Sequence, residues 1–418
     1  MREAAAYLTV AVTLGLVVVR PRIGASFRVN PALAAFIGVL FMFAVGIVKP
    51  EHWVMAVTNL WSPFVALVAI MVMTEVARRA GLLAWWAHLI EVRAVSTSRL
   101  FLLVFGLGVL TSTAFNNDAA ILLLTPVVVA LVKQRYPGRP EMVPPFAFAV
   151  FMSAGVAAFP VSNPMNMVVS EFLHIGFNEY ARHMIPVAIA GWIIAFLLLR
   201  VVFGSRLNAQ ILPAPAVSIP STKVQRMVMG LLFCVLVSYP VFGAMGGPVW
   251  AIASVGALCS FVLARTQMKT EPLELLRNGV SWETLAFLLA VLVMSLGLRD
   301  VGLVEHLAGL YSHSGLTVIG ITSAIGSALL NNHPMSHLNM MALETPSPAG
   351  DLGVFAALVG GDLGPRLLPM GSLAGLLWIE MLHRQGVEIS VGRFVWIGLV
   401  IGVPTIAASL GILSLYGG

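Results

Sequence analysis

Residues 113–126 read TAFNNDAAILLLTP and place Asn116, Asn117 and Asp118 inside a long run of otherwise apolar residues. Amide and charged side chains are disfavoured in hydrocarbon unless protein, water or a ligand surrounds them. This stretch therefore indicates a buried functional site within a membrane-spanning region.

The composition of the whole chain is typical of a membrane protein. Of its 418 residues, 59% are hydrophobic and 10% are charged, and the mean hydropathy is +0.94. Soluble domains carry far more charge. Because apolar runs recur from near residue 5 to residue 416, we expect an all-α, multi-pass protein without a separate extramembrane domain. The net charge of +6 comes from basic residues in short loops, which is typical of membrane orientation and not of nucleic-acid binding.

The apolar runs predict about ten transmembrane helices, five in each half of the chain. The predicted spans cover residues 5–20, 31–48, 58–77, 142–174, 183–203, 223–242, 246–265, 281–298, 350–384 and 393–416. Two further apolar segments, 99–132 and 316–343, have short arms and polar tips, and we expect each to form a re-entrant helical hairpin. Residues 81–95 and 177–184 carry Trp or Tyr and are expected at the membrane interface.

The distribution of Lys and Arg predicts the orientation. If each hairpin enters and leaves on one face, 19 of the 24 basic residues lie in loops on one side, four lie on the other, and Arg366 lies within a span. The crowded side is then cytoplasmic, and both termini are periplasmic. Because each half has an odd number of spans, we expect an inverted repeat made of residues 1–203 and 223–418, joined by a linker over 204–222.

The repeat is also visible in the motifs. GVLTSTAFNNDAAILLLTP at 108–126 is echoed by GSALLNNHPMSHLNMMAL at 326–343, and each is followed by a proline-interrupted span, AFPVSNPMNMVV at 158–169 and GGDLGPRLLPMGSLAG at 360–375. Proline within a helix removes a backbone hydrogen bond, so the spans 142–174 and 350–384 are predicted to be half-helices joined by unwound backbone. Unwound backbone at that depth must face protein or a cavity. We expect the two tips and the two breaks to meet at one midplane site.

These patterns select the candidate residues. The candidates for substrate binding are Asn116, Asn117, Ser162, Asn163, Asn166, Asn331, Asn332, Gly371 and Ser372. The candidates for proton coupling are Asp118, Asp362 and His333. In the alternative interpretation, the Asn pairs only join helices, and Asp362 and Arg366 form a structural ion pair four residues apart. Glu75, Glu283 and Glu380 lie near span ends, and we expect them to be solvated there.

Several motifs resemble a known family. FNNDAAILLLTPVVVAL (115–131), VSNPMNMVVSEFLHIGFNEYARHMIPVAIA (161–190), LLNNHP (329–334) and GGDLGPRLLPMGSLAGLLWIEML (360–382) resemble the arsenite efflux permeases of the ArsB type, within the ion transporter superfamily. The resemblance implies a bacterial inner-membrane exporter of arsenite and antimonite, as neutral trihydroxides, that works by proton antiport and alternating access. Some members of the family work with a soluble ATPase subunit.

Two features depart from the family pattern. The segment GVAAF at 155–159 lacks an acidic residue, and His333 stands where relatives carry an apolar one. The proton carrier is therefore left among Asp118, Asp362 and His333.

The alternative function is a Na⁺- or H⁺-coupled transporter of another small anion, or a Na⁺/H⁺ antiporter of the same superfamily. Such a carrier should have Ser-Asn-Thr motifs in both halves, whereas Ser162 and Asn163 precede Pro164 and have no counterpart in the second half. Because no metal triad or nucleophile constellation is evident, we expect neither an enzyme nor a bound metal or cofactor.

Overall fold

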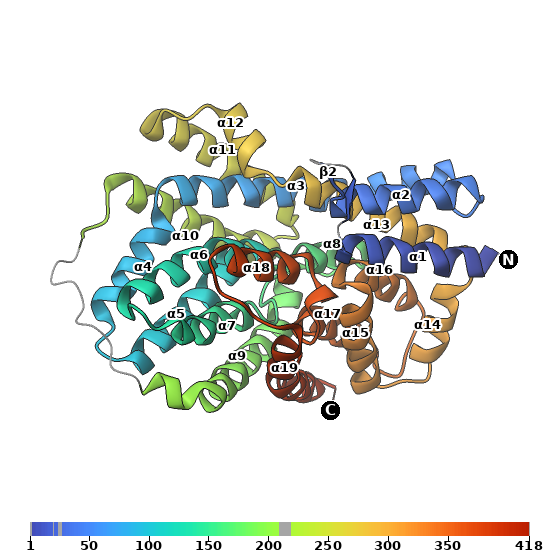
Figure 1. The fold of residues 1–418 in the computed structure, drawn as a ribbon. Coiled ribbons are helices and arrows are strands. Elements are labelled where there is room, and N and C mark those ends of the chain that lie inside the picture. Colours follow the sequence, from blue (N-terminus) through green and yellow to red (C-terminus); the bar gives the residue numbers. More distant parts are fainter. Residues whose placement is uncertain (1, 20, 24–26, 209–218, 418) are drawn as a thin grey trace.

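The computed structural model describes residues 2–19, 21–23, 27–208 and 219–417. These residues are helical apart from loops and two short strands, β1 (Arg22–Ile23) and β2 (Phe27–Arg28), which pair antiparallel. The predicted helical fold class is confirmed (Figure 1).

The helices of the first half lie close to the predicted ranges. They are α1 (Arg2–Val19), α2 (Pro31–Ala44), α3 (Pro50–Arg79), α4 (Leu82–Arg93), α5 (Thr97–Ala114), α6 (Asn117–Arg135), η1 (Pro140–Met142), α7 (Val143–Ser153), η2 (Pro160–Ser162), α8 (Pro164–Phe172) and α9 (Phe177–Leu207). The second half contains α10 (Lys223–Gly243), α11 (Val249–Met268), α12 (Pro272–Gly279), α13 (Trp282–Arg299), α14 (Leu303–Tyr311), α15 (Leu316–Leu330), α16 (Asn332–Ala342), α17 (Leu352–Leu363), η3 (Gly364–Arg366), η4 (Pro369–Gly371), α18 (Leu373–Arg384) and α19 (Val391–Ser414).

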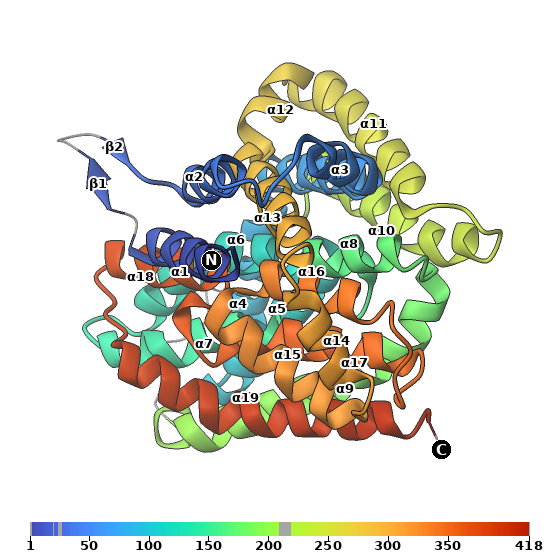
Figure 2. The same cartoon turned by 90° about the vertical axis from the view of Figure 1, so that its right-hand side faces the viewer.

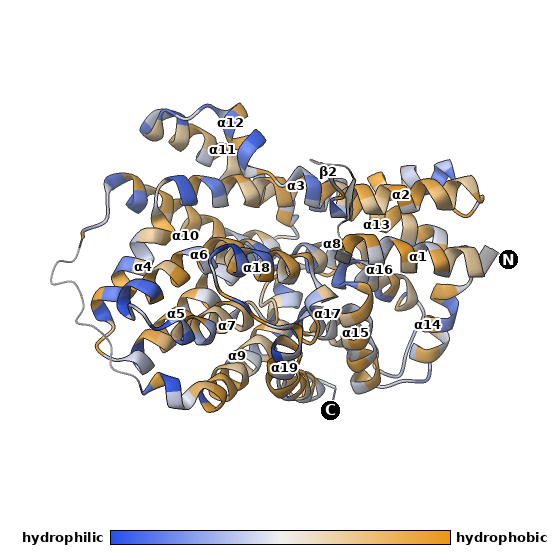
Figure 3. Cartoon of the chain, viewed as in Figure 1, coloured by the Kyte–Doolittle hydropathy of each residue, from blue (hydrophilic) through white to orange (hydrophobic). Residues whose placement is uncertain are grey.

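Eight helices of the described residues are long and apolar enough to cross a membrane: α3, α5, α6, α9, α10, α11, α13 and α19. The chain is a multi-pass membrane protein. The arms of the first hairpin are longer than expected, because α5 and α6 have 18 and 19 residues, whereas α15 and α16 have 15 and 11. Large apolar side chains such as Val201, Phe233 and Val262 are exposed on α9, α10 and α11, as lipid contact requires. Hydrophobic residues predominate along these helices (Figure 3).

The order of the elements occurs twice. In each half, a long helix and a short helix precede a helical hairpin, a broken helix and a final long helix, as α3 to α9 and again as α13 to α19. The packing also recurs: α3 packs against α11 as α13 packs against α2, and α8 packs against α16 as α18 packs against α6.

The elements form two groups. The helices α2, α3, α11, α12 and α13 lie along one side of the molecule, and the hairpins, the broken helices, α9 and α19 lie on the other (Figures 1 and 2). The first group contacts the second where α3 meets α8 and where α13 meets α16. The breaks lie within the second group, next to these contacts.

Glycines allow the close approach of α15 to the second broken helix. A Cβ on Gly360 would collide with the backbone of Gly320 and Ala324, and a Cβ on Gly364 would collide with the carbonyl oxygen of Ala324. At Gly371, a Cβ would lie 2.6 Å from the Cα of Pro365. Small residues at such contacts let backbones pack closely in membrane proteins.

Candidate functional site

Four of the predicted site residues cap half-helices that begin inside the protein. The Oδ1 atoms of Asn116, Asn163 and Asn331 and the Oγ of Ser372 accept backbone N–H groups at 2.6, 3.2, 3.3 and 3.0 Å. They begin α6, α8, α16 and α18, respectively. These side chains satisfy N–H groups that the helix itself leaves unpaired, and each helix N-terminus carries a partial positive charge.

Within each half, the hairpin tip is hydrogen-bonded to the break. In the first half, the Nδ2 of Asn117 donates to the carbonyl of Gly155 at 3.1 Å, and the hydroxyl of Ser162 donates to the carbonyl of Thr113 at 3.2 Å. In the second half, the Nδ2 of Asn331 donates to the carbonyl of Met370 at 3.4 Å. Tip and break of one half thus form one polar unit.

Asp362 connects the two halves of the chain. Its carboxylate lies on α17 and accepts hydrogen bonds from the Nδ2 of Asn163 at 2.6 Å, the Nδ2 of Asn166 at 3.0 Å and the backbone N–H of Ala157 at 2.8 Å. All three donors belong to the first break, and Asp362 is 2% exposed. Because every partner is an N–H donor, the geometry suits an ionised carboxylate.

Tyr180 is a part of this network that the sequence analysis missed. Residues 177–184, which we predicted as an interfacial helix, form the first two turns of α9. Tyr180, predicted as an interfacial anchor, is instead fully buried. Its hydroxyl accepts the Nδ2 of Asn166 at 2.7 Å and donates to the carbonyl of Ala157 at 3.1 Å. The position of Tyr180 directly after a broken span was the available signal.

Arg366 does not form the local ion pair that its spacing from Asp362 suggested. No salt bridge joins the two among the residues that the structure describes, and the guanidinium lies 4.5 Å from the ring centroid of Phe151. The helix changes to a 3-10 turn at Gly364, so residues four apart no longer share a face. Arg366 is buried and acts on Asp118 and Asp362 through the electrostatic field alone.

Asp118 and Asn116 line a cavity of about 290 Å³, which we call the vestibule. Its polar lining consists of Thr74, Glu75, Arg78, Asn116, Asp118, Asn278, Ser281 and Thr284. Asn278 and Ser281 are exposed, so the vestibule reaches the protein surface. In the described part of the chain, the Nδ2 of Asn116 has no hydrogen-bond partner, and Asp118 forms neither a hydrogen bond nor an ion pair.

Glu75 at the mouth of the vestibule is buried, contrary to the expectation of a solvated span end. It is 6% exposed and pairs with Arg78 at 2.6 Å and Arg79 at 2.7 Å, and Arg79 also pairs with Glu274 at 2.7 Å. The two arginines follow Glu75 by three and four residues, a spacing that brings their side chains onto the same face of α3.

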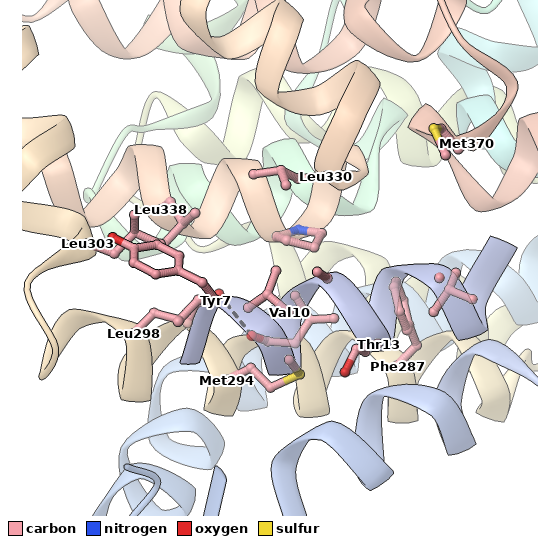
Figure 4. A pocket seen from close by; sticks show the side chains of 16 residues that line it. Tyr7, Val10, Thr13, Phe287, Met294, Leu298, Leu303, Leu330, Leu338 and Met370 are labelled. Carbon is pink, nitrogen blue, oxygen red and sulfur yellow. Dashed lines mark hydrogen bonds between the residues drawn. The ribbon is translucent and has the colours of Figure 1, made fainter. Parts of the chain in front are cut away.

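The remaining candidates lie at the second tip and break, away from the vestibule lining. Asn332 and His333 are buried, and the His333 ring lies edge-on to that of Phe287 at 6.0 Å. Beside them lies an apolar cavity of about 630 Å³, lined by side chains of α1, α13, α14, α15 and α16 and by Met370 of η4 (Figure 4). The structure therefore joins the first tip, the first break and Asp362 by direct bonds, whereas the second tip is joined to its own break.

Known proteins resemble this chain over nearly its whole length. A model of the family described as arsenical pump membrane protein matches residues 5–416. The chain is 30% identical over 423 residues to an arsenical pump membrane protein of Escherichia coli, and 30% identical over 424 residues to one of Yersinia enterocolitica, with 96% of each chain covered in both cases.

Solved structures share this fold. The YdaH transporter of Alcanivorax borkumensis matches with a TM-score of 0.61 at 17% sequence identity, and the match covers 100% of this chain and 98% of that one.

Proposed function

This chain belongs to the arsenical pump membrane protein family, and we propose that it exports arsenite and antimonite, as neutral trihydroxides, across the bacterial inner membrane in exchange for protons. The observation that carries the proposal is the chemistry of the vestibule. Beyond the Glu75–Arg78 pair and Asp118, its polar groups are uncharged amides and hydroxyls.

These groups suit a neutral trihydroxide. Each hydroxyl of As(OH)₃ donates one hydrogen bond and accepts others, so amide and hydroxyl groups can recognise it without a countercharge. The Nδ2 of Asn116 is a donor at the inner end of the vestibule, and the N-terminus of α6 adds oriented N–H groups. Reversible binding of this kind permits release on the other side.

The positions of the cations disfavour an anionic substrate. Arg78 lines the vestibule but is paired with Glu75, and Arg366 lies over Phe151. An anion in the vestibule would therefore face the carboxylate of Asp118, which forms no ion pair with the described residues, and a lining whose one cation, Arg78, is already paired. This repulsion favours the neutral metalloid over a small dicarboxylate.

Among the three candidate proton carriers, Asp118 has the best access from the vestibule. It forms neither a hydrogen bond nor an ion pair with the described residues, and it lies in the first turn of α6, where the helix dipole favours a negative charge. Asp362 is held by three donors, which suits a structural anion linking the halves. We propose that Asp118 exchanges protons with the vestibule and that Asp362 stays ionised.

Transport then proceeds by alternating access between two inverted repeats, residues 1–203 and 223–418. The twofold recurrence of element order and packing supports the repeat. With the predicted topology, the vestibule opens to the cytoplasm and both termini are periplasmic. The apolar cavity between α1, α13 and the second hairpin supports movement of the hairpins, because sliding along apolar side chains breaks no hydrogen bonds (Figure 4).

The test is transport in everted membrane vesicles under an imposed pH gradient. Arsenite and antimonite should accumulate, and accumulation should not require sodium. Succinate should neither accumulate nor compete. Sodium-dependent uptake, or uptake of succinate in place of arsenite, would instead assign the chain to the cation-coupled anion carriers. Equal transport with and without a soluble ATPase preparation and ATP would show that the permease works alone.

A further inference from the structure

The helix of the second hairpin, α16, carries a cluster of buried polar atoms without protein partners. His333 and His337 are 2% and 0% exposed, and Asn332 is 6% exposed. Four of their atoms have no hydrogen-bond partner in the part of the chain that the structure describes: Nδ1 of His333, Nδ1 and Nε2 of His337, and Oδ1 of Asn332. Buried polar groups in native proteins are nearly always paired, so four such atoms within six residues point to a ligand.

The two histidines are placed to share that ligand. They are four residues apart on one helix, which puts them on the same face. Each neutral imidazole offers one acceptor nitrogen, and the Oδ1 of Asn332 is a further acceptor. A cluster of this kind can hold a proton on one of the imidazoles, whose N–H the amide oxygen of Asn332 can then accept as a hydrogen bond.

Charged or titratable groups on the helices around α16 are either engaged elsewhere or exposed. Helices α8, α13, α14, α15 and α17 pack against α16. They carry Glu171 (bonded to Ser62), Glu283, Arg299 (paired with Glu344), Glu305, His306, Tyr311 (bonded to Asn339) and Asp362. Glu283, Arg299, Glu305 and His306 are exposed, and α15 carries none. No carboxylate of the described residues pairs with either histidine, so a bound proton would not be trapped in a permanent ion pair.

We propose that His333 and His337 form the proton-binding site of the second half and that Asn332 couples this site to the substrate. This inference rests on the proposed antiport function and adds His337 to it. A proton on either ring adds a positive charge close to the positive N-terminal end of α16 and gives Asn332 an N–H donor nearby. The inference requires that alternating access brings the metalloid from the vestibule to the second tip. Both effects disfavour a metalloid hydroxyl there, so proton and metalloid exclude each other.

The test is arsenite exchange in liposomes with equal pH on both sides, measured from acid to alkaline pH. Wild-type exchange should fall several-fold toward acid pH, because protons compete with arsenite. The His333→Asn and His337→Asn variants should show weaker acid inhibition than the wild type, because only the proton site at Asp118 remains. They should also accumulate arsenite about tenfold less under a pH gradient. The control His306→Asn, an exposed histidine on α14, should behave as wild type.

Several outcomes would overturn the inference. Acid inhibition and gradient-driven accumulation that stay at the wild-type level in both variants would exclude the histidines as the proton site. If a variant does not fold, the same transport assays are made on His337→Gln. In addition, the release of protons is measured when arsenite is added to purified wild-type protein. The absence of proton release would contradict the coupling. Wild-type protein without arsenite exchange at any pH would refute the proposed function itself, which is a distinguishable result.

Discussion

Replacement of Asp362 by Asn tests the bond network between the two halves. The substitution keeps the size of the side chain and replaces one carboxylate oxygen by an NH₂ group. In the structure, one oxygen accepts from the Nδ2 of Asn163, and the other accepts from the Nδ2 of Asn166 and the N–H of Ala157. An amide cannot serve both positions, because its NH₂ must face at least one N–H donor.

The expected magnitude follows from the number of bonds lost. The oxygen of the introduced amide keeps most bonds if it faces Asn166 and Ala157, which leaves Asn163 without an acceptor. Asn163 cannot simply rotate its amide, because its Oδ1 caps α8 through the N–H of Met165. One hydrogen bond to a charged group contributes about 1.5–3 kcal/mol. The substitution should therefore weaken the link between the halves by about 10- to 150-fold.

The assay combines stability with two modes of transport. Thermal unfolding of the purified protein in detergent should begin at a lower temperature in Asp362→Asn. Arsenite exchange at equal pH and accumulation under a pH gradient should fall together, because a link between the halves is lost and not a proton carrier. The matched control is Asp351→Asn, which makes the same change at an exposed position beside the same helix.

Two results would refute the reasoning. If Asp362→Asn unfolds at the same temperature as the Asp351→Asn control and transports normally, the carboxylate does not join the halves. If exchange persists while gradient-driven accumulation alone is lost, Asp362 carries the proton and the assignment of a permanently ionised anchor is wrong.

Three further substitutions test other parts of the molecule. Asp118→Asn should abolish arsenite accumulation driven by a pH gradient but preserve exchange at equal pH, measured in vesicles, since it removes a proton carrier without breaking a bond. Glu75→Gln should lower the free energy of unfolding by about 1.5–3 kcal/mol, because its hydrogen bonds to Arg78 and Arg79 become weaker. The control Glu274→Gln, at an exposed position, should lower it by less than about 1 kcal/mol. Thermal melts of the two variants measure the difference. Gly371→Ala should destabilise by about 1–3 kcal/mol because its Cβ would meet backbone. Gly204→Ala, a control within α9 with open space around it, should melt at or slightly above the wild-type temperature. Equal melts of the two variants would contradict the packing argument.

Much of the fold could be predicted because its signals are local. The Asn-Asn pairs mark the tips of both hairpins, and the prolines at 160, 164, 365 and 369 mark both breaks. Asn116, Asn163, Asn331 and Ser372 could be selected as special because each caps a helix within three residues of itself. Capping depends on neighbours in the sequence, so the sequence is sufficient to find it.

The partners of the charged residues could not be predicted in the same way. Spacing suggested that Asp362 would pair with Arg366, yet its donors lie about 200 residues away in the other half. Tyr180 was interpreted as an interfacial anchor and is a buried member of that network. Glu75 was expected in solvent and is buried between two arginines.

The sequence by itself determined where helices begin, break and turn back, because apolar periodicity, proline and capping side chains act over a few residues. Only the tertiary structure decided which carboxylates are bonded and which, like Asp118, are left open to a cavity. The physical reason is that a buried charge takes its partner from whatever the fold brings within hydrogen-bond distance, and that distance in space has no fixed relation to separation along the chain.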